Sequence, residues 1–465
     1  MQHDLFDFCR GVAPLTPRLA RWMIRELSDA ESLGKRLDVH GSPLHLHAPA
    51  QMRRNIAAFT DVAKTRNIAM DMFYACKANK CRMYLDEAIA AGIGVDVASS
   101  NELNAAIEAG FSGSRIAITA TSKPEMMLRR AAEVGATIIA GSPEELRRVA
   151  DFASRASAES LNITIRISGF AFSNQRHDSR FGIDISQVMF AAKTVRVSGL
   201  HFHLDGTSIE DRVAAIHQTI LLAKSLRQAG HPIAYIDIGG GAPVQYLESE
   251  SDWIAFHHKL DIQLDRQWCD DEIKPIIFPN RTYGRTKMGR NFVQTDRNYP
   301  TWQADSSSVW LAKIFDSGGI ADSFRSNGLR LRMQPGRSLL EMCGITVARV
   351  ISCSPDKAGD TFVTLEMNQT NCKTTSVDFA VDPILVPHDK NNRPPATTGY
   401  LAGNYCAEDD LITPRRMRFD RGVQAGDILA FPNTAGYQMH FMESRGHQFD
   451  LPENIAIRPT SDELG

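Results

Sequence analysis

Four polar residues follow or interrupt short apolar runs, and their types suit covalent chemistry on a small molecule. They are Lys77 after the run 70–75, Asp96 within 93–97, Arg166 within 163–167 and His203 after 197–202. A lysine at the end of an apolar strand is partly desolvated, which makes its amine easier to keep neutral and nucleophilic. Such a lysine suits a Schiff base. Taken alone, however, Lys77 would more often be a solvated side chain beside Lys80.

Glycines and an arginine supply a second feature, a site for an anion. Gly239, Gly240 and Gly241 follow the run 234–238, and the sequence QPGR, which ends in Arg337, follows the run 329–333. Amides of a triple glycine can approach an anion closely, and a guanidinium adds a charged fork for phosphate. A triple glycine alone fits a plain turn, but with QPGR it favours phosphate. A lysine imine and a phosphate site together imply pyridoxal phosphate.

The frame that would gather these residues is a parallel α/β fold. Apolar, β-branched runs alternate with amphipathic stretches, and the runs are 70–75, 93–97, 115–119, 137–140, 163–167, 197–202, 234–238 and 329–333. Ser142 and Glu145 have the spacing of a capping box, and Gly110 and Gly135 stand where helices should stop. Eight such units predict an α/β TIM barrel, whose active site is built at the C-terminal ends of the strands.

The remaining chain predicts a second domain. After about residue 340, short strands separated by Pro, Gly, Asn and Asp replace the helical pattern, so residues 336–465 are expected to form a β-sandwich or β-barrel. Residues 1–45 lie outside the barrel pattern and are expected to pack on this β domain. The barrel would occupy 46–335, with an insertion at about 247–328 that is too long for a simple βα connection.

Composition narrows the class of protein. The 465 residues carry 52 Lys and Arg against 54 Asp and Glu, so no nucleic-acid partner is expected. No apolar run approaches the roughly 18 residues that cross a bilayer, and the opening lacks a signal peptide, which predicts a cytoplasmic protein without membrane contact. The eight cysteines include no CxxC pair, so no metal site is expected.

At this point the sequence resembles the alanine-racemase-like fold of pyridoxal enzymes, and within it the ornithine/diaminopimelate/arginine decarboxylase (group IV) family. The resemblance spans most of the chain and rests on several motifs in the right order. They are FYACKANK, GVDVASSNEL, HFH, IDIGGGAP, PGRSLL, GNYCAEDD and AGY.

The resemblance implies a role for each matching residue. Lys77 would carry the cofactor, and His203 would stack on its pyridine ring. Positions that support the lysine and the cofactor match Asp96, Glu102 and Arg166, and the phosphate site matches Gly239 to Gly241, Arg337 and Tyr437. Taken alone, Asp96 and Glu102 would fit the capping of a helix start equally well.

The resemblance also implies a homodimer with shared active sites. Cys406 matches a thiol donated by the partner subunit, which reprotonates the substrate carbon after carbon dioxide leaves. Taken alone, Cys406 would more often be an inert buried thiol. An acidic residue that holds the distal amino group of the substrate usually follows this cysteine, whereas here Ala407 follows and Glu408 and Asp409 come next. Those two carboxylates are the candidate substrate contacts.

Two further departures set the chain apart from the standard decarboxylases. Where the family has a glutamate that contacts the pyridine nitrogen, this chain has Gln334, which cannot hold that nitrogen protonated by charge. The usual HxGS is replaced by HLDGTS, so either Thr207 or Ser208 could supply the hydroxyl for phosphate. The motifs look closer to a divergent branch of siderophore and other secondary-metabolite pathways.

The leading hypothesis is a pyridoxal-phosphate-dependent decarboxylase of an amino acid or amino-acid-derived metabolite. Lys77 would bind the cofactor and Cys406 would protonate the product. A racemase or epimerase on the same fold is the first alternative, favoured by the uncharged Gln334. A non-catalytic cofactor-binding regulatory homologue is the second, although retention of the whole residue set argues against it.

Overall fold

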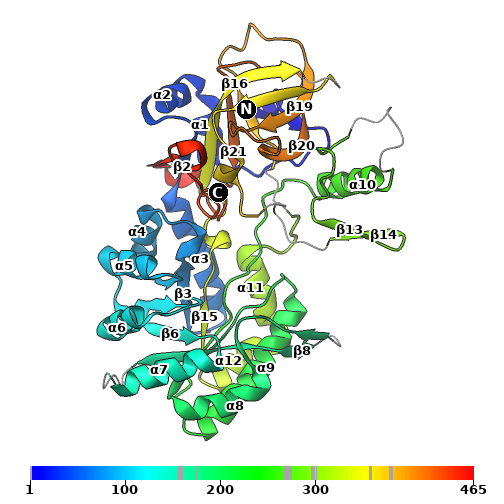
Figure 1. The fold of residues 1–465 in the computed structure, drawn as a ribbon. Helices are drawn as coiled ribbons and strands as arrows, with labels where there is room; N and C mark the ends of the chain where they lie inside the picture. Colours follow the sequence, from blue (N-terminus) through cyan, green and yellow to red (C-terminus); the bar gives the residue numbers. More distant parts are fainter. Residues whose placement is uncertain are drawn as a thin grey trace. The chain divides into compact units, whose positions relative to one another are not determined.

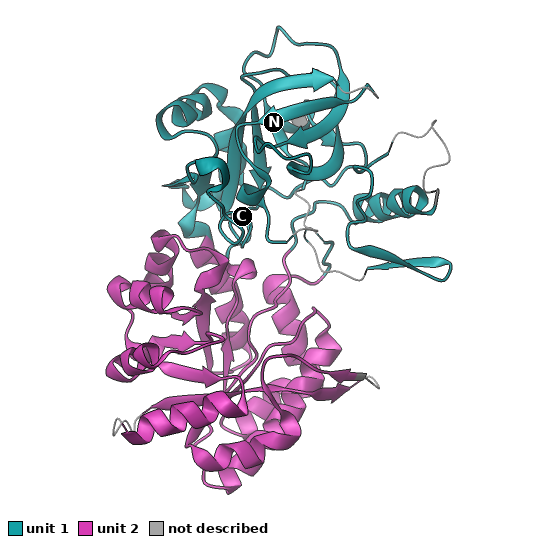
Figure 2. Ribbon diagram, in the orientation of Figure 1, with its two compact units in different colours: residues 1–51, 245–304, 340–465 teal, residues 52–244, 305–339 magenta. Residues whose placement is uncertain are grey.

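The structure is a computed structural model, and it divides the chain into two compact units (Figure 2). Residues 1–51, 245–304 and 340–465 form the first unit, and residues 52–244 and 305–339 form the second. The structure describes residues 3–155, 161–172, 175–266, 275–294, 299, 301–355, 359–375 and 381–465. Each unit is described by itself below.

The second unit is a closed barrel of eight parallel strands. In barrel order they are β3 (Met70–Ala75), β4 (Gly94–Val97), β5 (Ile116–Ile118), β6 (Thr137–Ala140), β7 (Asn162–Ser168), β11 (Val197–Phe202), β12 (Tyr235–Asp237) and β15 (Arg330–Met333), which pairs with β3 again. The short β10 (Ile183–Asp184) adds to β7. All eight predicted runs are barrel strands, so the prediction of a TIM barrel is confirmed.

Helices connect the strands of the barrel (Figure 1). They are α3 (Pro49–Thr65), α4 (Arg82–Ala90), α5 (Ser100–Ala109), α6 (Glu125–Val134), α7 (Pro143–Arg155), α8 (Val188–Ala191), α9 (Ile209–Gln228), α11 (Ser307–Asp316) and α12 (Ile320–Ser326). A hairpin of β8 (Phe170–Phe172) and β9 (Gln175–His177) follows β7. The chain leaves α5 and α6 through Gly110 at φ 100° and Gly135 at φ 75°, left-handed conformations that favour glycine.

The first unit is built on a nine-stranded sheet. Its main path is β1 (Arg10–Gly11), β20 (Leu411–Phe419), β19 (Thr397–Ala402), β17 (Thr361–Leu365), β16 (Gly344–Pro355), β2 (Leu44–His47) and β22 (Glu453–Ala456), while β21 (Ile428–Pro432) pairs with β16 and with β18 (Ile384–Val386). The N-terminal segment contributes β1 and β2 to this sheet, along with α1 (Arg21–Ser28) and α2 (Ala30–His40). Trp22 and Leu33 of these helices lie in one apolar core with Ile345 of β16.

The segment between β12 and β15 divides between the units. Residues 245–304 belong to the first unit and contain α10 (Glu250–Arg266) and a hairpin of β13 (Arg285–Met288) and β14 (Asn291–Gln294). Residues 305–339 belong to the barrel unit, where Trp310 of α11 is buried. The stretch predicted as one insertion at 247–328 therefore includes two barrel helices as well as α10 and its hairpin.

A buried histidine gives the first unit a dependence on pH. His47 of β2 is fully buried, its Nε2 lies 2.8 Å from Asn454 Oδ1, and burial lowers its pKa to about 4. The unfolded chain therefore binds more protons than the folded chain between about pH 6.5 and pH 4, and stability falls as the pH falls through that window. The contribution is about 3 kcal/mol, from about 1.4 kcal/mol per pKa unit.

We expect His47→Gln to flatten the loss of unfolding free energy between pH 6.5 and pH 4 by roughly that amount. Denaturant titrations at several pH values measure it, with the partly exposed His40→Gln of α2 as the control. Equal acid slopes in His47→Gln and wild type would contradict this assignment.

Candidate active site

Hydrogen bonds connect four strand ends at one mouth of the barrel. Ala75 N, two residues before Lys77, donates to Pro335 O at 3.1 Å, and Gln334 N donates to Gly239 O at 2.8 Å. Gly240 N donates to His203 Nδ1 at 3.3 Å. The ends of β3, β15, β12 and β11 are thus linked, and Lys77, QPGR, the triple glycine and His203 are brought together as the sequence predicts.

A buried carboxylate lies beside the predicted cofactor lysine. Lys77 stands in a 3-10 turn directly after β3, and its Nζ is 3.7 Å from Asp96 Oδ2. Asp96 is 1% exposed, and its Oδ1 accepts a hydrogen bond from Thr119 Oγ1 at 2.6 Å. Burial raises the pKa of Asp96, while Lys77 and Thr119 oppose that rise. A buried carboxyl needs a cation to stay ionised, so Asp96 and Lys77 form a coupled pair.

Glu102 and Arg166 complete this side of the mouth. Glu102 Oε2 accepts from Ala98 N at 2.6 Å, while Ser99 Oγ accepts from Glu102 N at 3.1 Å. Glu102 therefore does support a helix start, and the charges of Asp96 and Lys77 also act on its pKa, which burial raises. The guanidinium of Arg166 lies 4.8 Å from the ring centroid of Phe181, and burial lowers its pKa against the attraction of Asp96.

The triple glycine is needed because the chain passes too close to its neighbours for side chains. Gly239 has a φ of 67°, and a Cβ there would lie 2.7 Å from Phe202 O and 2.9 Å from His203 Nδ1. A Cβ on Gly240 would lie 2.7 Å from Gln334 O. This is a tight backbone turn, in which Gly239 N and Gly240 N donate to Asp237 Oδ1 and His203 Nδ1.

Gly240→Ala is expected to weaken cofactor binding by at least about tenfold, since the added methyl group must displace the backbone of Gln334. Titration of the cofactor into stripped protein measures the dissociation constant. Gly34→Ala of α2 is the control, because a Cβ there meets no atom within 4 Å. Unchanged affinity in Gly240→Ala would place the cofactor away from this turn.

Two buried residues that the sequence reasoning did not assign lie beneath the mouth. Asp237 is 1% exposed, and its Oδ1 accepts from Gly239 N at 2.8 Å while its Oδ2 accepts from Gln334 Nε2 at 2.7 Å. His201, its register neighbour on β11, is also buried, and burial lowers its pKa well below the usual value. A carboxylate inside the apolar run 234–238 was the available signal for Asp237.

A third missed residue, Arg212 of α9, fixes the loops that follow β11 and β12. Its fully buried guanidinium donates to Ile238 O at 3.0 Å and to Leu204 O and Gly206 O, each at 3.3 Å. Trp310 adds a hydrogen bond from its indole nitrogen to Thr207 O at 2.8 Å. The signal was an arginine on the apolar face of a helix, where only a polar partner makes burial tolerable.

The two hydroxyls of HLDGTS have different surroundings. Ser208 is the N-cap of α9, and its Oγ accepts from Asp211 N at 3.1 Å and donates to Glu210 Oε2 at 3.3 Å. Thr207 is half-buried in the loop held by Arg212 and Trp310. Because the cap engages Ser208, Thr207 is the better candidate for a phosphate contact.

Cys406 and Tyr437 belong to the first unit. Cys406 is exposed, and Asp410 holds its loop because Oδ1 accepts from Gln369 N and Oδ2 from Tyr405 N, each at 2.9 Å. Glu408 and Asp409 are exposed on the same loop. The ring of Tyr405 lies 5.1 Å from that of His447, so GNYC and the segment after AGY meet in this unit. Tyr437 is half-buried with a φ of 71°.

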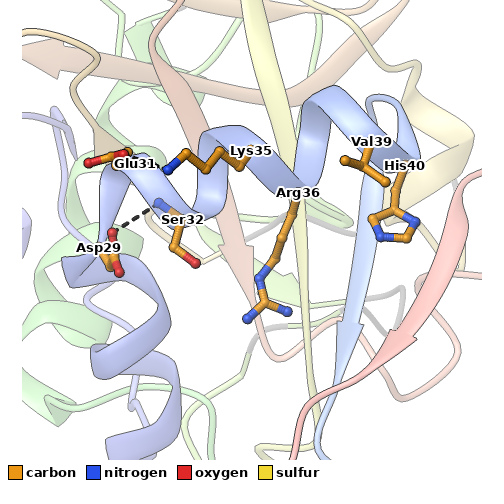
Figure 3. A pocket seen from close by; sticks show the side chains of 7 residues that line it. All are labelled: Asp29, Glu31, Ser32, Lys35, Arg36, Val39 and His40. Atoms are coloured by element: carbon orange, nitrogen blue, oxygen red, sulfur yellow. Dashed lines mark hydrogen bonds and ion pairs between the residues drawn. The ribbon is translucent and has the colours of Figure 1, made fainter.

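Residues of α2 and its N-cap line a shallow pocket in the first unit (Figure 3). There Asp29 Oδ1 accepts a hydrogen bond from Ser32 N, and Lys35 pairs with Glu31. No group of three or more His, Cys, Asp or Glu side chains in the described part of the chain is arranged to hold a metal ion. No described helix has the length and apolarity to cross a membrane.

The arrangement fits pyridoxal phosphate in the chemistry of its groups. Lys77, paired with the buried Asp96, suits the aldehyde, and the guanidinium of Arg337, just after β15, suits the phosphate. Asp237 and Gln334 add buried polar groups at the same strand ends. The fold and site define a TIM barrel with a lysine paired to a buried carboxylate at the C-terminal ends of its strands.

The comparisons with known proteins name this class. The sequence model described as "Pyridoxal-dependent decarboxylase, pyridoxal binding domain" matches residues 50–283, and the chain belongs to this family of enzymes, which bind pyridoxal phosphate. An uncharacterized protein of Sinorhizobium fredii, y4yA, is 31% identical, with 90% of this chain and 88% of that protein aligned. Diaminopimelate decarboxylase of Staphylococcus aureus is 22% identical over 90% of this chain and 89% of its own length.

Solved structures agree on the fold. Diaminopimelate decarboxylase of Helicobacter pylori, complexed with L-lysine, gives a TM-score of 0.68 at 16% identity, covering 92% of this chain and 94% of that chain. Arginine decarboxylase of Paramecium bursaria Chlorella virus, bound to agmatine, gives 0.68 at 18% identity, covering 92% and 100%. The predicted family, fold class and cofactor are therefore confirmed.

Proposed function

We propose that this chain decarboxylates an amino acid or amino-acid-derived metabolite at the barrel mouth, with Lys77 as the residue that binds pyridoxal phosphate. The observation that carries the proposal is the contact of 3.7 Å between Lys77 Nζ and the buried Asp96. This carboxylate draws the lysine toward the mouth and balances its charge. When bound, the cofactor withdraws electrons from the substrate carbon as its carboxylate leaves.

The other residues of the mouth bind and orient. The amide of Gly241, the guanidinium of Arg337 and the hydroxyl of Thr207 would hold the phosphate, with Tyr437 as a further contact. Gly239 and Gly240 would shape the turn, because their amides donate to Asp237 and His203. His203, oriented by the hydrogen bond from Gly240 N to its Nδ1, would cover one face of the ring. Arg166 and Glu102 would support Lys77 and Asp96 through the electrostatic interactions among these four side chains.

The first unit would supply the proton and the substrate specificity. The exposed thiol of Cys406 suits proton delivery to the substrate carbon across the interface of a homodimer with shared active sites. Asp410 is committed to holding the loop, so recognition of a distal amino group falls to the exposed Glu408 and Asp409. Diaminopimelate, arginine, ornithine and lysine, named by the relatives and neighbours, define the substrate class to test first.

The test combines borohydride fixation with product analysis. The purified protein is reduced with borohydride and digested, and mass spectrometry locates the modified lysine, with Lys80 as the internal control. Carbon dioxide release is then measured over a panel of amino acids in deuterated water. Label on Lys77, carbon dioxide release and one deuterium in the product are expected.

Two results would overturn the proposal. Deuterium exchange at the substrate carbon without carbon dioxide would indicate a racemase or epimerase. A fixed cofactor with neither exchange nor carbon dioxide on any member of the panel would favour a cofactor-binding regulatory protein. Cys406→Ala, compared with wild type on the same substrate, separates the proton-delivery role, because only the protonation step should slow.

A further inference from the structure

The buried pair of Asp237 and Gln334 has a fixed orientation. The amide nitrogen of Gln334, Nε2, donates to Asp237 Oδ2 at 2.7 Å. Gly239 N occupies the other carboxylate oxygen at 2.8 Å. Gln334 is therefore held with its nitrogen toward Asp237 and its carbonyl oxygen, Oε1, on the opposite side of the amide.

Two titratable side chains, His201 and Asp237, lie beside Gln334, and Asp237 is the one that can carry a charge. His201 is 2% exposed, and neither of its ring nitrogens makes a hydrogen bond of good geometry with a described residue. Gln334 favours its protonated form, but burial outweighs this and lowers the pKa of His201 well below the usual value, so the ring is neutral. Burial raises the pKa of Asp237 to about 7, so a cation placed nearby would favour its ionised form.

The chemistry of the cofactor selects one of its groups for this position. Its phosphate suits the glycine turn and Arg337, and its aldehyde carbon suits Lys77. Of the two polar atoms that remain, the phenolic oxygen next to the aldehyde needs donors once ionised. The protonated ring nitrogen carries a positive charge and one N–H donor. A carbonyl oxygen backed by a carboxylate matches the ring nitrogen.

We propose that Asp237 is a positioning residue that acts through Gln334 to keep the ring nitrogen of the cofactor protonated. This inference rests on the proposed function. Gln334 Oε1 would accept a hydrogen bond from the ring N–H, while Gln334 Nε2–H donates to Asp237 Oδ2, and no proton would move along the chain of hydrogen bonds. The carboxylate of Asp237 would polarise the amide of Gln334 and through it stabilise the positive charge of the ring nitrogen. The neutral Gln334 thereby takes the place of the glutamate that contacts the ring nitrogen in the family, and the negative charge stays on Asp237.

Nitrogen NMR of the holoenzyme tests this directly. Protein reconstituted with pyridoxal phosphate labelled with ¹⁵N in the ring is compared in wild type, Asp237→Asn and Gln334→Met. We expect a protonated ring-nitrogen shift in wild type and an unprotonated shift in both variants, with cofactor dissociation constants raised about tenfold. Gln334→Met keeps the size of the side chain and leaves Asp237 in place, so it serves as the test if Asp237→Asn fails to fold.

A double variant separates charge from structure. Asp237→Asn keeps the shape of the side chain and removes its charge, so a merely structural role for Asp237 would leave the shift protonated. Asp237→Asn combined with Gln334→Glu exchanges the positions of carboxylate and amide, and it should restore the protonated shift because a carboxylate charge is again close to the ring nitrogen. An unprotonated nitrogen in wild type or in the double variant would overturn the proposal. So would a protonated nitrogen in the single variants. Failure of borohydride to fix the cofactor on wild-type Lys77 would instead defeat the proposed function itself.

Discussion

Lys77→Ala is expected to lower the rate of carbon dioxide release by at least about 10³-fold, because the variant lacks the amine that we propose holds the cofactor in position. It should also lose the cofactor on dialysis and resist fixation by borohydride. Without the cation 3.7 Å away, the buried Asp96 would favour its protonated form, so added amines should restore little activity.

Lys80→Ala provides the matched control for this prediction. Lys80 lies three residues further along, beyond the 3-10 turn that places Lys77, and it is exposed. Absorbance of the dialysed proteins and carbon dioxide release measure both variants. Retention of fixed cofactor in Lys77→Ala, or equal losses in the two variants, would show that a different lysine carries the cofactor.

Arg212→Met is expected to weaken both the fold and the cofactor site. The change leaves the carbonyl groups of Leu204, Gly206 and Ile238 without their buried donor. Each unsatisfied buried group costs about 1–3 kcal/mol, so a loss of about 3–5 kcal/mol in unfolding free energy is reasonable. Leu204 and Gly206 follow His203, and Ile238 precedes the triple glycine, so cofactor affinity should fall together with stability.

The same helix offers a control with the same chemistry at the opposite end of the strands. Arg227 of α9 donates to Ile233 O at 2.7 Å and to Asn327 O at 2.5 Å, in the loops that precede β12 and β15. Arg227→Met should lower stability but leave cofactor affinity unchanged. Denaturant unfolding and cofactor titration distinguish the two. Equal cofactor affinities in Arg212→Met and wild type would contradict a role in cofactor binding for the loops after β11 and β12.

The barrel could be predicted from the sequence because each of its strands is a short apolar run bounded by polar residues. The strand ends then gave Lys77, His203, Gly239 to Gly241 and Arg337 as candidates, since parallel strands gather their C-terminal ends at one mouth. The structure brings these strand ends together, and the roles of the residues stay predictions. Asp237 and Arg212 were missed because their partners are backbone groups and a glutamine amide that only the barrel register brings near. Sequence spacing contains no such information.

The division of the insertion was also beyond the sequence pattern. Helix α11 has only ten residues, and its apolar face does not differ in type from that of α10, which belongs to the other unit. Cys406 and Tyr437 were identified from their motifs alone, and their part in the site stays a prediction. The structure does explain why Asp410 is unsuited to substrate recognition, because two backbone amides occupy its carboxylate.

Both units are discontinuous in the chain, and this affects the order in which they can fold during synthesis. The barrel closes only when β15 pairs with β3, about 260 residues further along the chain. The sheet of the first unit needs β16 before β2 has a partner, so the N-terminal 51 residues must wait for the last third of the chain. Such long-range pairing is slow to form and exposes unpaired strand edges. A nascent chain that ends before β15 would therefore be a natural client for chaperones.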